Sequence, residues 1–174
     1  MLNQFSKTAA QIEGLIDQVG KVASWATLAI VGLISVNVFL RYTFSFGSVW
    51  AQELEWHLLA VMILLGMSFA LQRGDNVRVD VFYAQFSPQK KMIVDFISAL
   101  LTIIVSLIFI KLSISYVGQS LSIGEGSPDP GGIPARWAIK SLIPIGFCFV
   151  ALQGTAELLR LILAHKNLKA NNHV

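Results

Sequence analysis

Charged residues are scarce in this sequence. Asp, Glu, Lys and Arg make up 13% of its 174 residues, whereas hydrophobic residues make up 55%, and the mean hydropathy is +0.66. A soluble domain of this size needs far more polar surface, so the composition excludes the soluble globular class. Because the apolar residues form long continuous runs, the sequence predicts an all-α integral membrane protein and not a membrane β-barrel.

Cysteine is nearly absent as well. The single cysteine, Cys148, lies inside an apolar run, which excludes an internal disulfide and is typical of a small core side chain. The net charge of +3 does not indicate nucleic acid as a partner, because the basic residues lie at the ends of the apolar runs. The expected surroundings of the chain are membrane lipids, and no cofactor is predicted.

Four apolar segments are each about as long as the roughly 20 residues that cross a bilayer core. They span residues 22–40, 52–71, 92–117 and 138–163 of a single membrane domain, 1–174. Ser87 and Pro88 suit the cap and first turn of the third helix. Residues 1–21 carry apolar side chains at helical spacing. This segment is either an amphipathic interfacial helix or a helical extension of the first span, and the pattern does not choose between them.

The basic residues predict the topology. Nine of them flank the two termini and the connection between spans two and three, including Arg78, and four flank the other side. The positive-inside rule then places both termini in the cytoplasm. No span carries a charge at its centre, whereas ion-coupled carriers usually need ionisable groups or broken helices there.

The second span begins with polar residues among apolar ones, in "WAQELEWHLLAVMILLG". From Glu53, about 30 Å of helix reaches Arg73, so the acids lie at the outer boundary and not at mid-membrane. Arg41 ends the first span at the same boundary, and Asn37 lies one turn deeper. We therefore expect a polar clasp between the first two helices, in which Arg41 pairs with Glu53 or Glu55 and Asn37 pairs with His57.

Two tryptophans flank the clasp as an aromatic belt would. The predicted structural edge comprises Asn37, Arg41, Trp50, Glu53, Glu55, Trp56 and His57. Glu53 and His57 alone are too few ligands for a metal, and no further His, Cys or acidic cluster is expected at that depth. The sequence also offers no nucleophile–base pair, so an enzyme is not predicted.

Small residues at spacing four suggest close helix packing, for example Ser98, Thr102 and Ser106 on the third span. Between the third and fourth spans, "SIGEGSPDPGGIPARW" holds four glycines and three prolines. These residues forbid regular structure, so the segment is expected to be an extramembrane loop on the outer side.

Three stretches together resemble the small membrane subunit of tripartite ATP-independent periplasmic (TRAP) transporters. They are "NVFLRYTF", "WAQELEWHLLAVMILLGMSFALQRGDNVRVDVF" and "GGIPARWAIKSLIPIGF", in this order in a four-helix chain. Members often carry a histidine in the loop after the Arg-x-Gly element, where this sequence has Asp75 and Asn76.

The resemblance implies a non-catalytic scaffold subunit of a sodium-coupled importer in the bacterial inner membrane. Its partners would be a large, elevator-type membrane subunit and a periplasmic binding protein that delivers a C4-dicarboxylate, sialic acid or a keto acid. The binding protein is then expected to dock on the outer loop, at Pro128, Asp129, Pro130 and Arg136. The alternative is an autonomous, homo-oligomeric, ion-coupled carrier, which would need Glu53 or Glu55 as its membrane acid.

Overall fold

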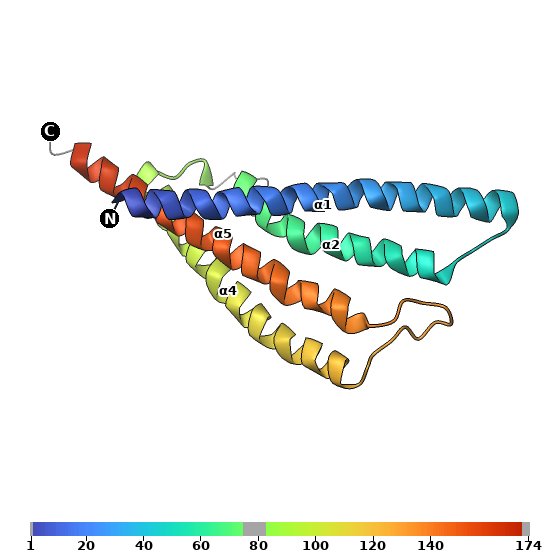
Figure 1. The fold of residues 1–174 in the computed structure, drawn as a ribbon. Helices are drawn as coiled ribbons and strands as arrows, with labels where there is room; N and C mark the ends of the chain where they lie inside the picture. The colour runs from blue at the N-terminus through green and yellow to red at the C-terminus, as the bar shows by residue number, and fades with distance from the viewer. Residues whose placement is uncertain (1, 75–82, 172–174) are drawn as a thin grey trace.

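Long helices make up the fold of the described residues (Figure 1). The computed structural model describes residues 2–74 and 83–171, with the side chains of residues 4–74 and 83–166. Within these residues the helices are α1 (Leu2–Phe44), α2 (Val49–Arg73), α4 (Pro88–Ser122) and α5 (Arg136–Asn171), and no strand occurs. Each helix is long and apolar enough to cross a membrane. The predicted class, all-α with four membrane-spanning helices, is thereby confirmed. Asp75, Asn76 and Arg78 lie outside the described residues.

Polar caps set the ends of two helices. Ser48 precedes α2 in an extended conformation, and its hydroxyl accepts the N–H of Ala51 at 3.4 Å. At the other end of α2, Gly74 adopts φ of 70°, and its N–H reaches the last carbonyls of the helix. Ser87 caps α4 by accepting the N–H of Lys90, with Pro88 in the first turn. The start signal read from the sequence is therefore confirmed.

Residues 2–21 and the first span form one continuous helix (Figure 1). With 43 residues, α1 is about 65 Å long, roughly twice the thickness of a bilayer core. Its first half is not free, because Ala9 and Ile16 are completely buried. The structure therefore agrees with the helical extension.

Ion pairs hold this extension against α2 and α5. Arg160 of α5 binds both carboxylate oxygens of Glu13, with Nε–Oε1 at 2.9 Å and Nη2–Oε2 at 2.5 Å. Arg73 at the end of α2 contacts Asp17 at 3.4 Å. Both termini and these pairs lie at one end of the molecule, which we call the terminal end. The opposite end, with the connections 45–48 and 123–135, is the loop end (Figure 1).

Small side chains form the contacts between helices. The helices pair as α1 with α2 and α4 with α5, and α5 also contacts α1 and α2. On α4 the buried residues recur every seventh position, Ala99, Ser106, Ser113 and Ser120, which is the period of a left-handed helix pair. On α5, a Cβ at Gly146 would lie 2.6 Å from the carbonyl oxygen of Leu64, so only glycine allows this approach of α2.

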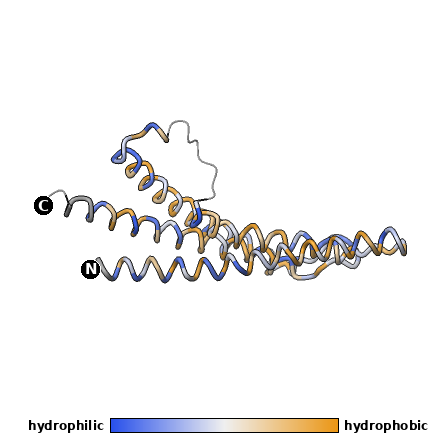
Figure 2. Tube along the Cα trace, turned by 90° about the horizontal axis from the view of Figure 1, so that it is seen from above, coloured by the Kyte–Doolittle hydropathy of each residue, from blue (hydrophilic) through white to orange (hydrophobic). Residues whose placement is uncertain are grey.

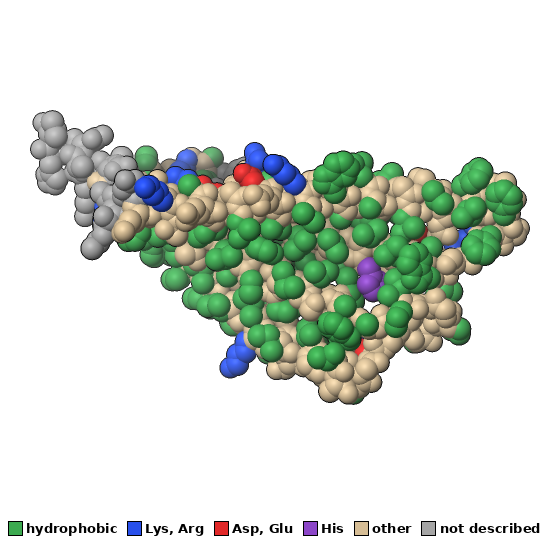
Figure 3. Space-filling view, in the orientation of Figure 1, with side chains coloured by type: hydrophobic (Ala, Val, Ile, Leu, Met, Phe, Trp, Pro, Cys, Tyr) green, Lys and Arg blue, Asp and Glu red, His purple; other side chains and the backbone are tan. Residues whose placement is uncertain are grey.

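The large apolar side chains point outward instead. Figure 3 shows apolar side chains over much of the face between the two ends of the molecule. The exposed large apolar residues include many of α4, such as Leu107, Leu112 and Ile114. The helices spread apart towards the loop end in Figure 1, yet Figure 2, turned by 90°, shows them there in a narrow band. At this end the molecule is a flat layer with apolar surfaces.

Candidate functional site

The loop end is organised around one buried carboxylate, that of Glu53 in the first turns of α2. Its exposed fraction is 2%, and no other ionisable side chain of the described residues is buried. One oxygen accepts the hydroxyl of Ser127 and lies 3.5 Å from Arg136 Nη2. The other accepts the N–H of Ile133 at 2.5 Å. We call these four residues the Glu53 cluster.

The connection 123–135 wraps around this carboxylate. The N–H of Asp129 donates to the hydroxyl of Ser127 at 3.1 Å, and the N–H of Gly132 donates to the carbonyl of Asp129 at 3.0 Å. A Cβ at Gly132 would lie 2.7 Å from Glu53 Oε2 and would also meet the side chain of Ser127. The close fit of the loop against the carboxylate therefore requires glycine at this position.

A second set of contacts ties the start of the same loop to α5. The carbonyl of Glu125 accepts the N–H of Arg136 at 2.9 Å, and its carboxylate pairs with Lys140. The Lys140 ammonium also lies 4.2 Å from the ring centre of Tyr116 on α4. Because Lys140 donates to Glu125, the pKa of this carboxyl lies below its usual value. The loop is thus fixed at both ends.

The contacts between α1 and α2 differ from the predicted clasp. Asn37 donates to Glu55 Oε1 at 3.0 Å, and the imidazole Nδ1 of His57 lies 2.6 Å from the carbonyl oxygen of Glu53, in its own helix. The predicted pair of Asn37 with His57 is therefore wrong. The predicted pair of Arg41 with Glu53 or Glu55 is also wrong, because Glu53 pairs with Arg136 and Glu55 accepts from Asn37, and neither pairs with Arg41.

The other residues predicted at this edge stay on the surface. Arg41 is exposed and has no ion-pair or hydrogen-bond partner within the described part of the chain. Trp50 and Trp56 are 50% and 59% exposed, at the level where an aromatic belt would lie. The structure thus brings Asn37 to Glu55 and leaves Arg41 and the tryptophans outside the Glu53 cluster.

The four residues predicted as a docking loop divide into two groups. Pro128, Asp129 and Pro130 are exposed at the turn of the connection. Arg136 instead begins α5 and points to Glu53, with its side chain 28% exposed. Arg136 therefore stabilises the loop from within and is not part of the exposed turn. Sequence reasoning did not find Ser127 and the N–H of Ile133 as partners of Glu53, because neither position carries a pattern that indicates such a role.

The arrangement binds a loop and does not resemble a reaction centre. The Glu53 carboxylate accepts hydrogen bonds from Ser127 and Ile133 and pairs with Arg136. These contacts hold the loop in place. Across residues 2–74 and 83–171, no group of three or more His, Cys, Asp or Glu side chains could hold a metal ion.

Comparisons with known proteins agree with this architecture. The family described as "Tripartite ATP-independent periplasmic transporters, DctQ component" matches residues 30–164, which begin within the first predicted span and include the other three predicted spans and the Glu53 cluster. No curated protein matches the chain. The family match covers most of the sequence. The chain therefore belongs to the DctQ family, the small membrane component of TRAP transporters, and is a multi-pass membrane protein of a transporter family and not of an enzyme family.

Proposed function

We propose that this chain is the non-catalytic scaffold subunit of a binding-protein-dependent importer. In this proposal it pairs with a large, elevator-type membrane subunit that carries the substrate and sodium sites. A periplasmic binding protein delivers the substrate, an organic acid such as a C4-dicarboxylate, sialic acid or a keto acid. The assembly lies in the bacterial inner membrane. The DctQ match supports the transporter component, and the finer roles are inferred from the family.

The distribution of polar groups carries the proposal. One polar layer lies at the loop end, around Glu53 and Glu55, and the other at the terminal end, around Glu13 and Arg160. Between them the buried polar side chains of the described residues, such as Ser68 and Ser106, are uncharged. A carrier that moves ions through its own helices would need a charged or ion-coordinating site at that depth. This distribution of polar groups therefore favours a role in packing against other helices.

The positive-inside rule orients the proposed subunit. It places the terminal end in the cytoplasm and the loop end in the periplasm, where a binding protein has access. The Glu53 cluster then supports the exposed turn at Pro128, Asp129 and Pro130 from beneath. A loop fixed in this way offers a preorganised docking surface, which costs less conformational entropy on binding than a free loop.

Reconstitution tests the proposal. One set of liposomes contains this chain alone, a second contains a large membrane subunit that co-purifies with it, and a third contains both. Uptake of a radiolabelled organic acid is then measured with the binding protein and a sodium gradient. We expect uptake only when both membrane subunits are present. Uptake by this chain alone would contradict the scaffold role and support an autonomous carrier.

A further inference from the structure

A groove of about 290 Å³ opens between α1 and α2 at the loop end, separate from the Glu53 cluster. Its polar lining is Asn37, Arg41, Gln52 and Glu55. The structure gives Asn37 and Glu55 one hydrogen bond to each other, at 3.0 Å, and gives Arg41 no partner among the described residues. The groove therefore contains an unpaired guanidinium beside a carboxylate that has an oxygen to spare.

The two opposite charges line the same groove without pairing with one another. Had Arg41 and Glu55 formed an ion pair, they would neutralise each other and leave little to recognise. Kept apart, they are complementary to a ligand that itself carries a separated anion and cation. A guanidinium suits the phosphate of such a ligand, because it can donate two parallel hydrogen bonds. A carboxylate suits an ammonium group.

The apolar lining supplies the rest of the match. Ile34 and Val38 on α1 and Trp56 on α2 line the same groove, and they are 40%, 47% and 59% exposed. Ile34 lies about two helical turns deeper than Arg41, towards the middle of the span. Polarity thus rises along the groove from the membrane interior to its edge, as it does along a lipid molecule. Tryptophan is also typical of this interfacial level.

We propose that this groove binds one zwitterionic phospholipid of the leaflet at the loop end. Its headgroup lies across the groove, with the phosphate on Arg41 of α1 and the primary ammonium on Glu55 of α2, and an acyl chain runs along Ile34 and Trp56. A space of about 290 Å³ can hold a lipid headgroup, and the two separate opposite charges that line it match a phosphate and an ammonium. Asn37 positions the Glu55 carboxylate for the ammonium. The inference is independent of the transport role, because it needs only that the loop end lies at a membrane surface.

Native mass spectrometry of the purified chain, with any co-purifying subunits, tests the site. The protein is reconstituted in mild detergent and titrated with phosphatidylethanolamine, phosphatidylcholine and phosphatidylglycerol. We expect one tightly retained lipid, with phosphatidylethanolamine preferred because it offers both a phosphate and an ammonium that donates hydrogen bonds. Arg41→Gln should weaken retention of all three lipids about tenfold, as expected for one charge-assisted contact. Glu55→Gln, which can still accept from Asn37, should abolish the preference while retaining phosphate binding.

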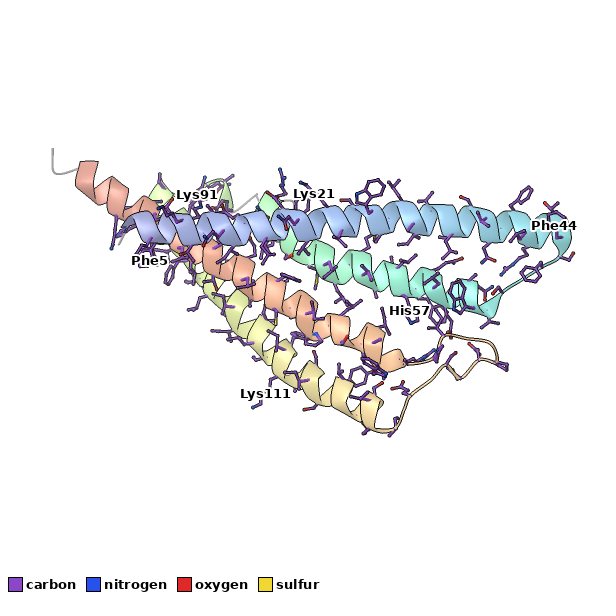
Figure 4. The ribbon with its side chains drawn as sticks, viewed as in Figure 1. Phe5, Lys21, Phe44, His57, Lys91 and Lys111 are labelled. Atoms are coloured by element: carbon purple, nitrogen blue, oxygen red, sulfur yellow. The ribbon has the colours of Figure 1, made fainter. Side chains whose placement is uncertain are left out.

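Lys111→Gln is the matched control. Lys111 is another exposed cation on an apolar face. It lies on α4, away from the groove between α1 and α2, and points outward from the helices (Figure 4). Equal lipid retention in Arg41→Gln and Lys111→Gln would overturn the proposal, and so would the absence of any headgroup preference in the unmodified chain. A photo-crosslinking side chain at Val38 adds an independent readout in native membranes. It should capture lipid, and capture of a protein subunit there would also overturn the proposal. Circular dichroism verifies that each variant keeps its helices.

Discussion

Gly132→Ala is the most direct perturbation of the contact between the loop and Glu53. The added Cβ would lie 2.7 Å from Glu53 Oε2 and closer still to the side chain of its partner Ser127, whereas ordinary contacts begin near 3.4 Å. A flexible side chain could move away at little cost, but this carboxylate is held by the N–H of Ile133 and by Ser127. Relief of the overlap therefore requires either a shift of the loop backbone or the loss of one of these hydrogen bonds.

Both routes cost a similar amount. Overpacking of a tight site costs about 1–3 kcal/mol, and the loss of one buried hydrogen bond costs about 1 kcal/mol or somewhat more. We therefore expect Gly132→Ala to lower the free energy of unfolding by about 1–3 kcal/mol. The measurement is the loss of helical circular dichroism as sodium dodecyl sulfate is added to protein in mild detergent. Cleavage within residues 123–135 by a protease should become faster in parallel.

Gly126→Ala is the matched control, because it makes the same chemical change in the same loop. A Cβ at Gly126 would meet nothing within 4 Å, and the residue does not have a positive φ. Its unfolding free energy should stay the same or rise by less than about 1 kcal/mol, since alanine restricts the unfolded chain. Equal unfolding free energies and cleavage rates for the two variants would refute the assignment of Gly132 to the carboxylate contact.

Three further perturbations test the surrounding contacts. Glu53→Gln should destabilise the loop end more than Asp129→Asn, which changes an exposed side chain of the loop. The rate of proteolysis within residues 123–135 measures the difference, and equal cleavage rates would contradict the buried role of Glu53. The pKa of Glu125 is lowered by Lys140 in the folded protein, so its stabilising contribution is present above its ordinary pKa and is lost as pH falls through the lowered value. Thermal unfolding from neutral to acidic pH should therefore show the difference between the unmodified chain and Glu125→Gln shrinking, and a constant difference would exclude this linkage. Arg160→Gln should cost less than about 1 kcal/mol in the same detergent titration, because its pair with Glu13 is partly exposed; a larger loss would mean that the terminal end is more cooperative than its contacts indicate.

Composition was sufficient to predict the four helices, because a bilayer imposes a minimum apolar length that few soluble segments reach. The cap at Ser87 was predictable for a similar reason, since the N-terminal signals of helices are local. The partner of Glu53 was not predictable. The order of the spans placed Arg41 and Arg136 at the same end as Glu53, but depth alone does not give the rotation of each helix about its axis. The irregular loop then brought Arg136 inward.

The sequence also did not predict which face of α4 packs against its neighbour. Ser98, Thr102 and Ser106 follow a spacing of four and predicted a packing stripe, yet Ser98 is exposed and the buried residues of α4 recur every seventh position. Small residues occur on several faces of a membrane helix, and the crossing angle with α5 decides which face is used. That angle depends on contacts along the whole pair, including Gly154 of α5 near the carbonyl of Ala99.

The proposed scaffold role requires that this chain be a structural partner of a larger membrane subunit. The first test is affinity purification of the tagged chain from native membranes in mild detergent, followed by measurement of the masses of the bound proteins. We expect one many-helix membrane protein in a stoichiometric complex, and weaker recovery of that complex when the tagged chain carries Glu53→Gln. Recovery of a self-oligomer alone, without any second membrane protein, would contradict the scaffold role.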